Sequence, residues 1–139
     1  MLAVTLSLFG FSACNNDDNI NNNNSTETTL ENSTNKEITY EIISQTQAKD
    51  IMDNSTDYVI VDARTSEEFS EGHIKNAINL DYEEVTQKAE SLLPDKNQLI
   101  LIYCRSGRRS KIAAESLCQL GYTNVKEFGG IIDWAYETV

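Results

Sequence analysis

The chain has 139 residues, enough for one domain with its own core and too few for two ordinary domains. It carries 22 acidic and 11 basic residues, a balance that argues against a binding surface for nucleic acid or for an anionic membrane. Its three cysteines are odd in number and lack C-x-x-C spacing, so neither a disulfide framework nor a metal site is predicted. We expect no nucleic-acid partner, no metal and no organic cofactor.

Residues 1–13 are typical of a signal peptide. Leu2 to Ala13 is a run of apolar and small residues, too short to span a bilayer as a helix but suited to the apolar region of a signal peptide. The run ends in Phe-Ser-Ala-Cys14, which resembles the lipobox of bacterial lipoproteins. The resemblance implies that Cys14 is acylated and anchors an exported protein in the bacterial cell envelope, facing the periplasm or the surface. The membrane would be touched through this lipid only. The alternative is an N-terminal core strand or helix that contains a cysteine by chance.

Residues 14–36 have the composition of a disordered tether. From Asn15 to Lys36 the residues are almost all Asn, Asp, Ser, Thr or Glu, and seven of residues 15–24 are asparagine. Such a segment cannot bury enough apolar surface to offset the entropy lost on ordering. If flexible, it spans about 25 Å, which would hold a domain clear of a membrane surface. The folded domain is therefore predicted over residues 37–139.

From Glu37 onward, short apolar runs alternate with segments typical of helices. Strands are predicted over residues 38–43, 58–62, 77–80, 98–103 and 125–128. Helices are predicted from a capping box at Ser44 to about residue 52, over 82–93, over 110–120, and in a terminal helix containing Trp134. Strands alternating with helices predict an α/β fold, with a central, mainly parallel sheet of about five strands flanked by helices.

The segment joining the most apolar strand to the next helix reads Tyr-Cys-Arg-Ser-Gly-Arg-Arg-Ser over residues 103–110. In open α/β sheets, ligands bind at this carboxyl edge of the strands. A short loop there can direct its backbone N–H groups at one point, and the helix N-terminus adds partial positive charge. Cys104 would then have a lowered pKa and be nucleophilic at neutral pH. Taken alone, Cys104 would be interpreted as a small buried core residue in front of a solvated turn. Its combination with Gly107 and clustered arginines, between a buried strand and a helix, favours the nucleophile instead.

The spacing Cys104-x-x-Gly107-x-Arg109 resembles the active-site loop of single-domain rhodaneses. Upstream, Val-Asp-Ala-Arg at 61–64, Glu-Glu-Phe at 67–69 and Gly-His-Ile-x-x-Ala-Ile-Asn at 72–79 resemble the same family. Downstream, Leu-Gly-Tyr-x-x-Val at 120–125, Gly-Gly at 129–130 and Trp134 resemble its C-terminal end. The resemblance covers residues 37–139, about three quarters of the chain.

The resemblance implies a sulfurtransferase of the thiosulfate sulfurtransferase (rhodanese) type. Cys104 would take sulfur from a small anionic donor such as thiosulfate and hold it as a persulfide until cyanide, a thiol or a protein acceptor removes it. The loop residues would bind the donor and stabilise the persulfide through their backbone N–H groups. These residues are Arg105, Ser106, Gly107, Arg108 and Arg109. Arg109, at the helix start, would be structural, while Arg108 or Arg105 would face the donor.

Two other functions are compatible with a cysteine loop. The first is phosphatase or arsenate reductase chemistry, and phosphatases of the related dual-specificity class place five residues between cysteine and arginine and usually a histidine before the cysteine. Here four residues separate Cys104 from Arg109, and Tyr103 precedes the cysteine. The second alternative is a sulfur carrier or protein-binding module without turnover. Retention of Cys104 favours an enzyme, because binding-only members of the family commonly lose it.

Several further residues receive structural roles. Asp62 and Arg64 follow a predicted buried strand at the same sheet edge as Cys104, where we expect an ion pair that shapes the pocket wall. His73 is expected to be structural rather than a general base. Cys118 falls within a predicted helix and is expected to be a core thiol. Trp134 is expected to anchor the terminal segment, with an indole N–H that needs a partner.

Overall fold

The strands of this protein form one parallel sheet in the order β1-β5-β4-β2-β3. The structure is a computed structural model that describes residues 39–139. The strands are β1 (Glu41–Ile42), β2 (Tyr58–Asp62), β3 (Ala77–Asn79), β4 (Leu99–Cys104) and β5 (Val125–Gly130). The helices are α1 (Gln45–Asn54), α2 (Ser66–Glu71), α3 (Val85–Leu92), α4 (Arg108–Gln119) and the 3-10 turn η1 (Ile131–Asp133). The predicted parallel α/β sheet is confirmed.

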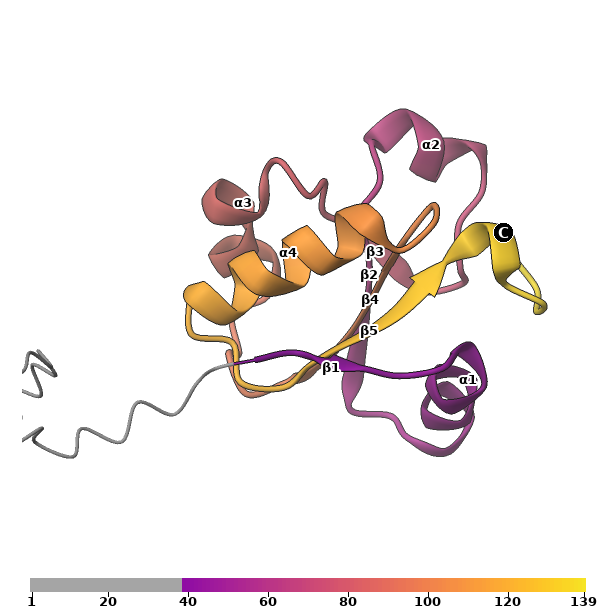
Figure 1. Ribbon diagram of the computed structural model, residues 1–139, viewed down its shortest axis with the longest axis horizontal. Coiled ribbons are helices and arrows are strands. Elements are labelled where there is room, and N and C mark those ends of the chain that lie inside the picture. Colours follow the sequence, from indigo (N-terminus) through magenta and orange to yellow (C-terminus); the bar gives the residue numbers. More distant parts are fainter. Residues whose placement is uncertain (1–38) are drawn as a thin grey trace, which may run out of the picture. The chain divides into compact units, whose positions relative to one another are not determined.

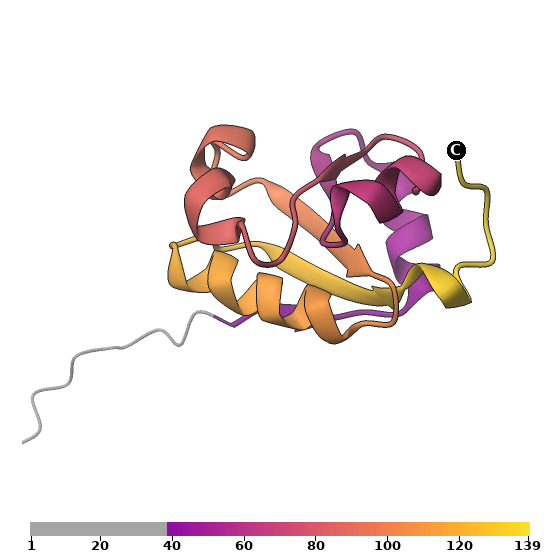
Figure 2. The same ribbon diagram turned by 90° about the horizontal axis from the view of Figure 1, so that it is seen from above.

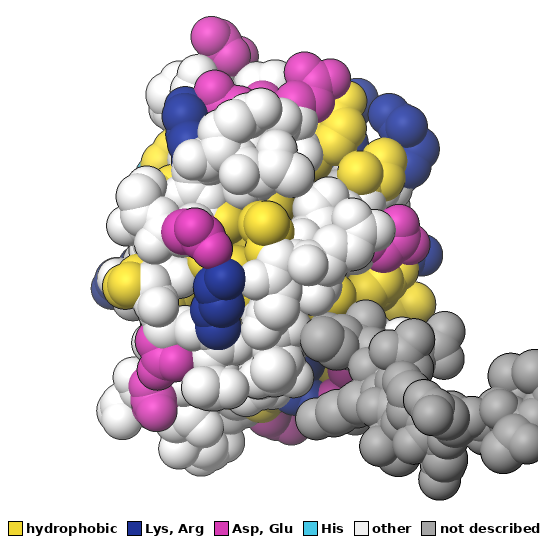
Figure 3. All heavy atoms as spheres, turned by 90° about the vertical axis from the view of Figure 1, so that its left-hand side faces the viewer, with side chains coloured by type: hydrophobic (Ala, Val, Ile, Leu, Met, Phe, Trp, Pro, Cys, Tyr) yellow, Lys and Arg dark blue, Asp and Glu magenta, His cyan; other side chains and the backbone are white. Residues whose placement is uncertain are grey.

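The predicted signal peptide, the lipidation site Cys14 and almost all of the tether lie outside the described residues. Within residues 39–139, no helix has both the length and the apolar character required to cross a bilayer. On the face of the molecule shown in Figure 3, acidic, basic and apolar side chains are interspersed, so the charge there is not segregated by sign.

Helices cover both faces of the sheet. Figures 1 and 2 show α3 and α4 together on one face and α1 on the other. Because successive side chains of a strand point to opposite faces, β4 contributes to two separate clusters. Ile100, Ile102 and Cys104 pack with α3 and α4, whereas Leu101 and Tyr103 pack with α1. The strand is buried on both faces, which explains its uninterrupted apolar sequence.

Two helices begin at capping boxes that can be read from the sequence. Ser44 caps α1, with its hydroxyl accepting from the N–H of Gln47 and the Gln47 side chain accepting from Ser44 in return. Thr65 and Glu68 form the same arrangement at the start of α2. Helix α1 agrees with the prediction, whereas α2 was not predicted, although its signal, Thr-x-x-Glu, is of the same kind.

The prediction of a terminal helix is wrong. After β5 there is a single 3-10 turn, η1, and Trp134 follows it. The backbone has other partners here: the N–H of Ile132 donates to the carbonyl of Arg105, and Val139 exchanges two backbone hydrogen bonds with His73. Because these backbone groups bond to distant segments, they are not available for the hydrogen bonds of a continuous helix. Helix α4 also begins two residues earlier than predicted, at Arg108.

Candidate active site

Cys104 is the last residue of β4, and only 1% of its surface is exposed. Its side chain lies on the α3 and α4 face, at the carboxyl edge of the parallel sheet. Residues 105–107 turn the chain from the strand into α4, and Gly107 is the N-cap of that helix, with φ +94°. A side chain at Gly107 would be strained in this conformation, because only glycine adopts a positive φ without steric cost.

Donor groups from the loop and from α4 surround the Cys104 sulfur. The N–H of Gly107 donates to Sγ at 3.0 Å, and the Ser110 hydroxyl lies 3.4 Å from it. Burial alone would raise the pKa of the Cys104 thiol. Hydrogen bonds from the Ser110 side chain and from backbone N–H groups of residues 106, 107 and 110 outweigh it and lower that pKa below its ordinary value. We call this set of donors the Cys104 cradle: the Ser110 hydroxyl and the backbone N–H groups of residues 106, 107 and 110. The cradle stabilises an anionic sulfur.

The loop rests directly on the end of β5. Cys104 is paired with Gly130 across the sheet, next to an irregularity in the register. A Cβ atom at Gly130 would lie 2.2 Å from the carbonyl oxygen of Arg105 and 2.6 Å from the Cα of Ser106. Gly130 has an ordinary extended conformation, with φ −122°, so the position requires glycine for space and not for backbone freedom. Gly130 is part of the Gly-Gly motif at 129–130, and this contact was not predicted from that motif.

The three loop arginines differ in their surroundings. Arg109 is half-buried and donates two hydrogen bonds to the Glu68 carboxylate of α2, at 2.6 and 2.8 Å. Chiefly through these bonds, Arg109 lowers the pKa of Glu68 to about 2. Arg105 and Arg108 are exposed, and neither forms an ion pair with any residue in 39–139. Arg109 thus ties the start of α4 to α2, while the other two cations stay at the surface of the loop.

Asp62 and Arg64 form the expected ion pair, but away from the sulfur. Arg64 donates to Asp62 through Nε at 3.0 Å and Nη2 at 2.6 Å, and the Tyr103 hydroxyl donates to the same carboxylate at 2.7 Å. Tyr103 belongs to the cluster on the α1 face, opposite the face that holds Cys104. Arg64 Nη2 also donates to the Gly72 carbonyl at 2.7 Å. The pair therefore fixes the segment after β2, and these contacts do not place it in the wall around Cys104.

The remaining sequence-predicted residues lie apart from the cradle. The His73 ring stacks on Phe69 with centroids 3.8 Å apart, and its Nδ1 lies 2.9 Å from the Phe69 carbonyl oxygen. Cys118 is a free, buried thiol within α4, and burial raises its pKa. Trp134 packs against the cluster on the α1 face, and its Nε1 has no hydrogen-bond partner among residues 39–139.

One buried carboxylate next to the site was not predicted. Glu127, in β5, is 1% exposed, and its Oε1 accepts from the Ser110 hydroxyl at 2.7 Å and from the N–H of Gly129 at 2.9 Å. Ser110 thus contacts both Glu127 and Cys104. No motif in the sequence marks Glu127, but a charged residue within a short apolar strand is itself a signal of a buried polar contact.

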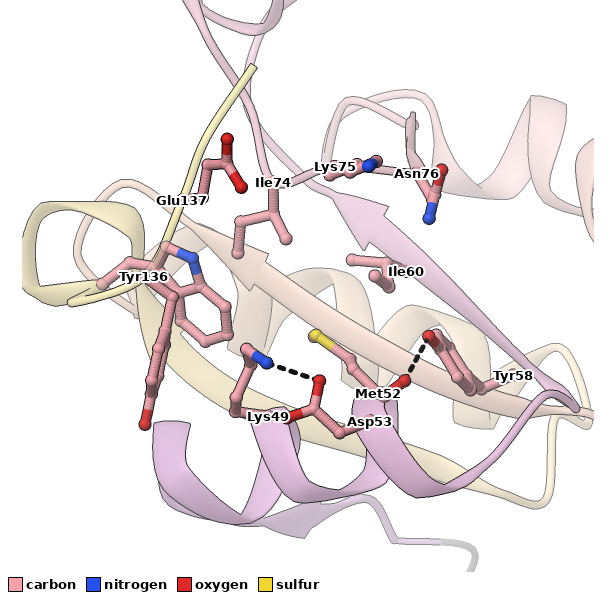
Figure 4. A pocket seen from close by; sticks show the side chains of 11 residues that line it. Lys49, Met52, Asp53, Tyr58, Ile60, Ile74, Lys75, Asn76, Tyr136 and Glu137 are labelled. Atoms are coloured by element: carbon pink, nitrogen blue, oxygen red, sulfur yellow. Dashed lines mark hydrogen bonds and ion pairs between the residues drawn. The ribbon is translucent and has the colours of Figure 1, made fainter.

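A separate cavity of about 210 Å³ lies on the opposite face of the sheet from Cys104, between α1, β2 and the C-terminal segment. Figure 4 shows Ile60 and Ile74 in it, with the Lys49–Asp53 ion pair and the hydrogen bond from Tyr58 to the Met52 carbonyl at one side. The described residues that line it include no cysteine or histidine.

Comparison with known families identifies the domain. A family model described as a rhodanese-like domain matches residues 44–137. The chain belongs to the rhodanese-like domain family. The matched region contains the whole Cys104 loop, α4 and β5, so the donor groups around the sulfur all lie within the rhodanese-like domain.

Relatives of this rhodanese-like domain include sulfurtransferases and sulfur carriers. It is 38% identical over 79 residues to thiosulfate sulfurtransferase PspE of Escherichia coli (strain K12), covering 57% of this chain and 76% of that protein. It is 33% identical over 91 residues to putative sulfur carrier protein YrkF of Bacillus subtilis (strain 168), covering 65% of this chain and 48% of that protein. A solved structure, a rhodanese with anions from E. coli, has a TM-score of 0.56 and 36% identity, covering 59% of this chain and 96% of that chain.

Proposed function

We propose that this rhodanese-like domain is an enzyme that transfers sulfane sulfur from thiosulfate, or a similar anionic donor, to a thiophilic acceptor. The observation that carries the proposal is the cradle around Cys104: a cysteine with a lowered pKa, at the N-terminus of α4, with donors directed at its sulfur. A thiolate is the nucleophilic form of cysteine, and such an environment is where reactive cysteines occur.

In the first half-reaction, the Cys104 thiolate attacks the outer sulfur of thiosulfate. A Cys104 sulfur–sulfur bond forms, the bond within thiosulfate breaks, and sulfite leaves with its electron pair. The product is a persulfide anion on Cys104. The N–H groups at residues 106, 107 and 110 that stabilise the thiolate also stabilise this anion, in the manner of an oxyanion hole.

In the second half-reaction, a nucleophile removes the outer sulfur. Cyanide attacks it, thiocyanate leaves, and the Cys104 thiolate is regenerated; a thiol or a protein thiolate reacts in the same way. Arg105 and Arg108, exposed at the loop, attract and orient the anionic donor, whereas Arg109 is occupied by Glu68 and holds the loop in place. An arginine engaged in this way also argues against a phosphatase, which needs its loop arginine for the phosphate.

A sulfur carrier without turnover is the second candidate, and the similarity to putative sulfur carrier protein YrkF favours it. A carrier and an enzyme both form the persulfide, so they differ only in the second half-reaction. An enzyme releases its sulfur to a small acceptor in repeated cycles, whereas a carrier stays loaded until it meets a specific protein partner.

We further propose that the domain works outside the cytosol, on a lipid anchor at Cys14. The apolar run, the lipobox-like sequence and the asparagine-rich segment support this location. Expression of the full gene in a bacterium, followed by membrane fractionation, tests it. The wild-type protein is expected in the membrane fraction, and a Cys14→Ser variant is expected to leave it.

Steady-state kinetics test the proposed enzyme. Thiocyanate formation is measured with thiosulfate and cyanide varied together, for the wild-type chain, for Cys104→Ser and for Cys118→Ser. A persulfide enzyme gives parallel double-reciprocal lines, because the two substrates react in separate steps. Cys104→Ser is expected to be inactive and Cys118→Ser fully active. Persulfide formation without turnover would favour the carrier, and activity in Cys104→Ser would exclude the proposal.

A further inference from the structure

The cavity between α1, β2 and the C-terminal segment combines an apolar floor with charged residues at its edge. Its volume of about 210 Å³ is below the roughly 300–1,000 Å³ of pockets for drug-sized ligands, so it fits a smaller molecule. Ile60 and Ile74 are its two buried lining residues, 2% and 3% exposed. Figure 4 shows them together with the Met52 side chain, and these three residues form the floor.

Four charged side chains line the cavity, and two of them neutralise each other. Lys49 is paired with Asp53 one turn along α1, and its ammonium group also lies 5.4 Å from the centre of the Tyr136 ring. Lys75 and Glu137 are both exposed, and they form no ion pair with each other or with any other residue in 39–139. Within the described part of the chain, the cavity therefore presents one positive and one negative group that lack a partner.

The backbone holds these two groups on either side of the floor. Ile74 and Thr138 form an antiparallel bridge between the turn before β3 and the C-terminal segment. Lys75 directly follows the bridge on one side, and Glu137 directly precedes it on the other. Asn76 has φ +66°, a left-handed conformation that asparagine tolerates in turns, and it leads the chain into β3 right after Lys75. Figure 4 shows Glu137 and Lys75 flanking Ile74, so a ligand seated on Ile74 lies between opposite charges.

We propose that this cavity binds a free α-amino acid with an apolar side chain. The carboxylate of the ligand pairs with Lys75 and its ammonium group with Glu137. Its side chain packs on the floor formed by Ile60, Ile74 and Met52. A zwitterion fits because the four lining charges sum to zero, whereas a ligand with a single charge would leave one of the two unpartnered groups without a contact.

Trp134 provides a reporter for this binding. It is the only tryptophan of the chain, and it lines the cavity. A ligand on the floor replaces water beside the indole ring, so a change in tryptophan fluorescence reports occupancy of this cavity and of no other. The titration uses the full chain without a sulfur donor, and its outcome is therefore independent of the proposed sulfur transfer.

The probes are L-leucine and L-phenylalanine, each compared with two analogues that lack one of its charges. Isoamylamine and phenethylamine lack the carboxylate, while isocaproate and hydrocinnamate lack the ammonium group. At least one of the two amino acids is expected to change the fluorescence in a saturable way. It is expected to bind about two- to fivefold more tightly than either of its analogues, which is the contribution of one exposed ion pair.

Two variants identify which charge meets which end of the ligand. Lys75→Gln is expected to remove the difference between the amino acid and its amine, and Glu137→Gln the difference between the amino acid and its acid. Lys111→Gln and Glu115→Gln are the matched controls, because they remove the same charges from exposed positions of α4, on the other face of the sheet (Figures 1 and 2).

The controls are expected to bind every probe as the wild-type chain does. Equal binding of an amino acid and its two analogues would overturn the inference, and so would the same loss of discrimination in the controls. No saturable response to either amino acid would overturn it as well. Discrimination in a protein that fails to transfer sulfur would count against the proposed function alone.

Discussion

Replacing Gly130 with alanine is expected to disrupt the Cys104 cradle from outside it. Gly130 contributes no group to the sulfur, yet an added Cβ would lie 2.2 Å from the Arg105 carbonyl oxygen and 2.7 Å from its carbonyl carbon. Ordinary contacts of this kind are 3.4–4 Å long. The clash is with backbone, so no side-chain rotation relieves it, and β5 and the loop must separate by more than about 1 Å.

The cost of this separation follows from the structure. Overpacking typically destabilises by about 1–3 kcal/mol, and a clash with backbone belongs at the upper end, so we expect a loss of about 3 kcal/mol. A movement of about 1 Å also takes Gly107 N and Cys104 Sγ, now 3.0 Å apart, out of hydrogen-bond range. Losing one such bond, about 1.4 kcal/mol, raises the pKa of Cys104 and reduces its thiolate fraction by up to about tenfold.

Urea unfolding measures the first effect and the alkylation rate of Cys104 the second. Gly121→Ala is the matched control, at the other end of α4. Gly121 has φ +92°, and its added Cβ would meet only Lys96 Cδ, at 3.8 Å. Backbone strain there is expected to cost about 1–2 kcal/mol while leaving Cys104 reactivity unchanged. A Gly130→Ala protein with wild-type stability and reactivity would refute the view that the loop rests on β5.

Three further predictions concern residues around the site. Asp62→Asn is expected to destabilise the domain by about 3–5 kcal/mol in urea unfolding, because it leaves the Arg64 guanidinium, 7% exposed, without its buried counter-charge. The pKa of Glu68, lowered from 4.5 to about 2, means that its ion pair with Arg109 stabilises the fold above pH 4.5 and that this contribution is lost as the pH falls toward 2. Arg109→Gln should therefore reduce the difference in unfolding free energy between about pH 6 and about pH 3, and an unchanged difference would count against the pair. Cys118→Ala is expected to cost about 1 kcal/mol and to leave sulfur loading intact, which mass measurement of the loaded chain checks.

The sequence predicted those parts of the fold that depend on local pattern. The alternation of apolar runs and capping signals identified five strands and helices α1, α3 and α4, because each depends on residues close together in the chain. The prediction of a terminal helix was wrong because the backbones of Ile132 and Val139 hydrogen-bond to distant segments. A local sequence pattern does not reveal such bonds.

The same distinction applies to the site. Cys104, Gly107 and Ser110 lie within seven residues of one another, so the loop and its helix were enough to predict a cradle. The contact of Glu127 with Ser110 depends on the register between β5 and β4, and that of Glu68 with Arg109 on the packing of α2. Both become visible only when the chain is folded.

The most direct test of sulfur transfer is the mass of the full chain before and after thiosulfate, with Cys104→Ser as the control. We expect a gain of about 32 Da on Cys104, lost on adding cyanide and absent in the control. No gain with thiosulfate or with any of a set of persulfide donors, or a gain on Cys118 instead, would contradict it.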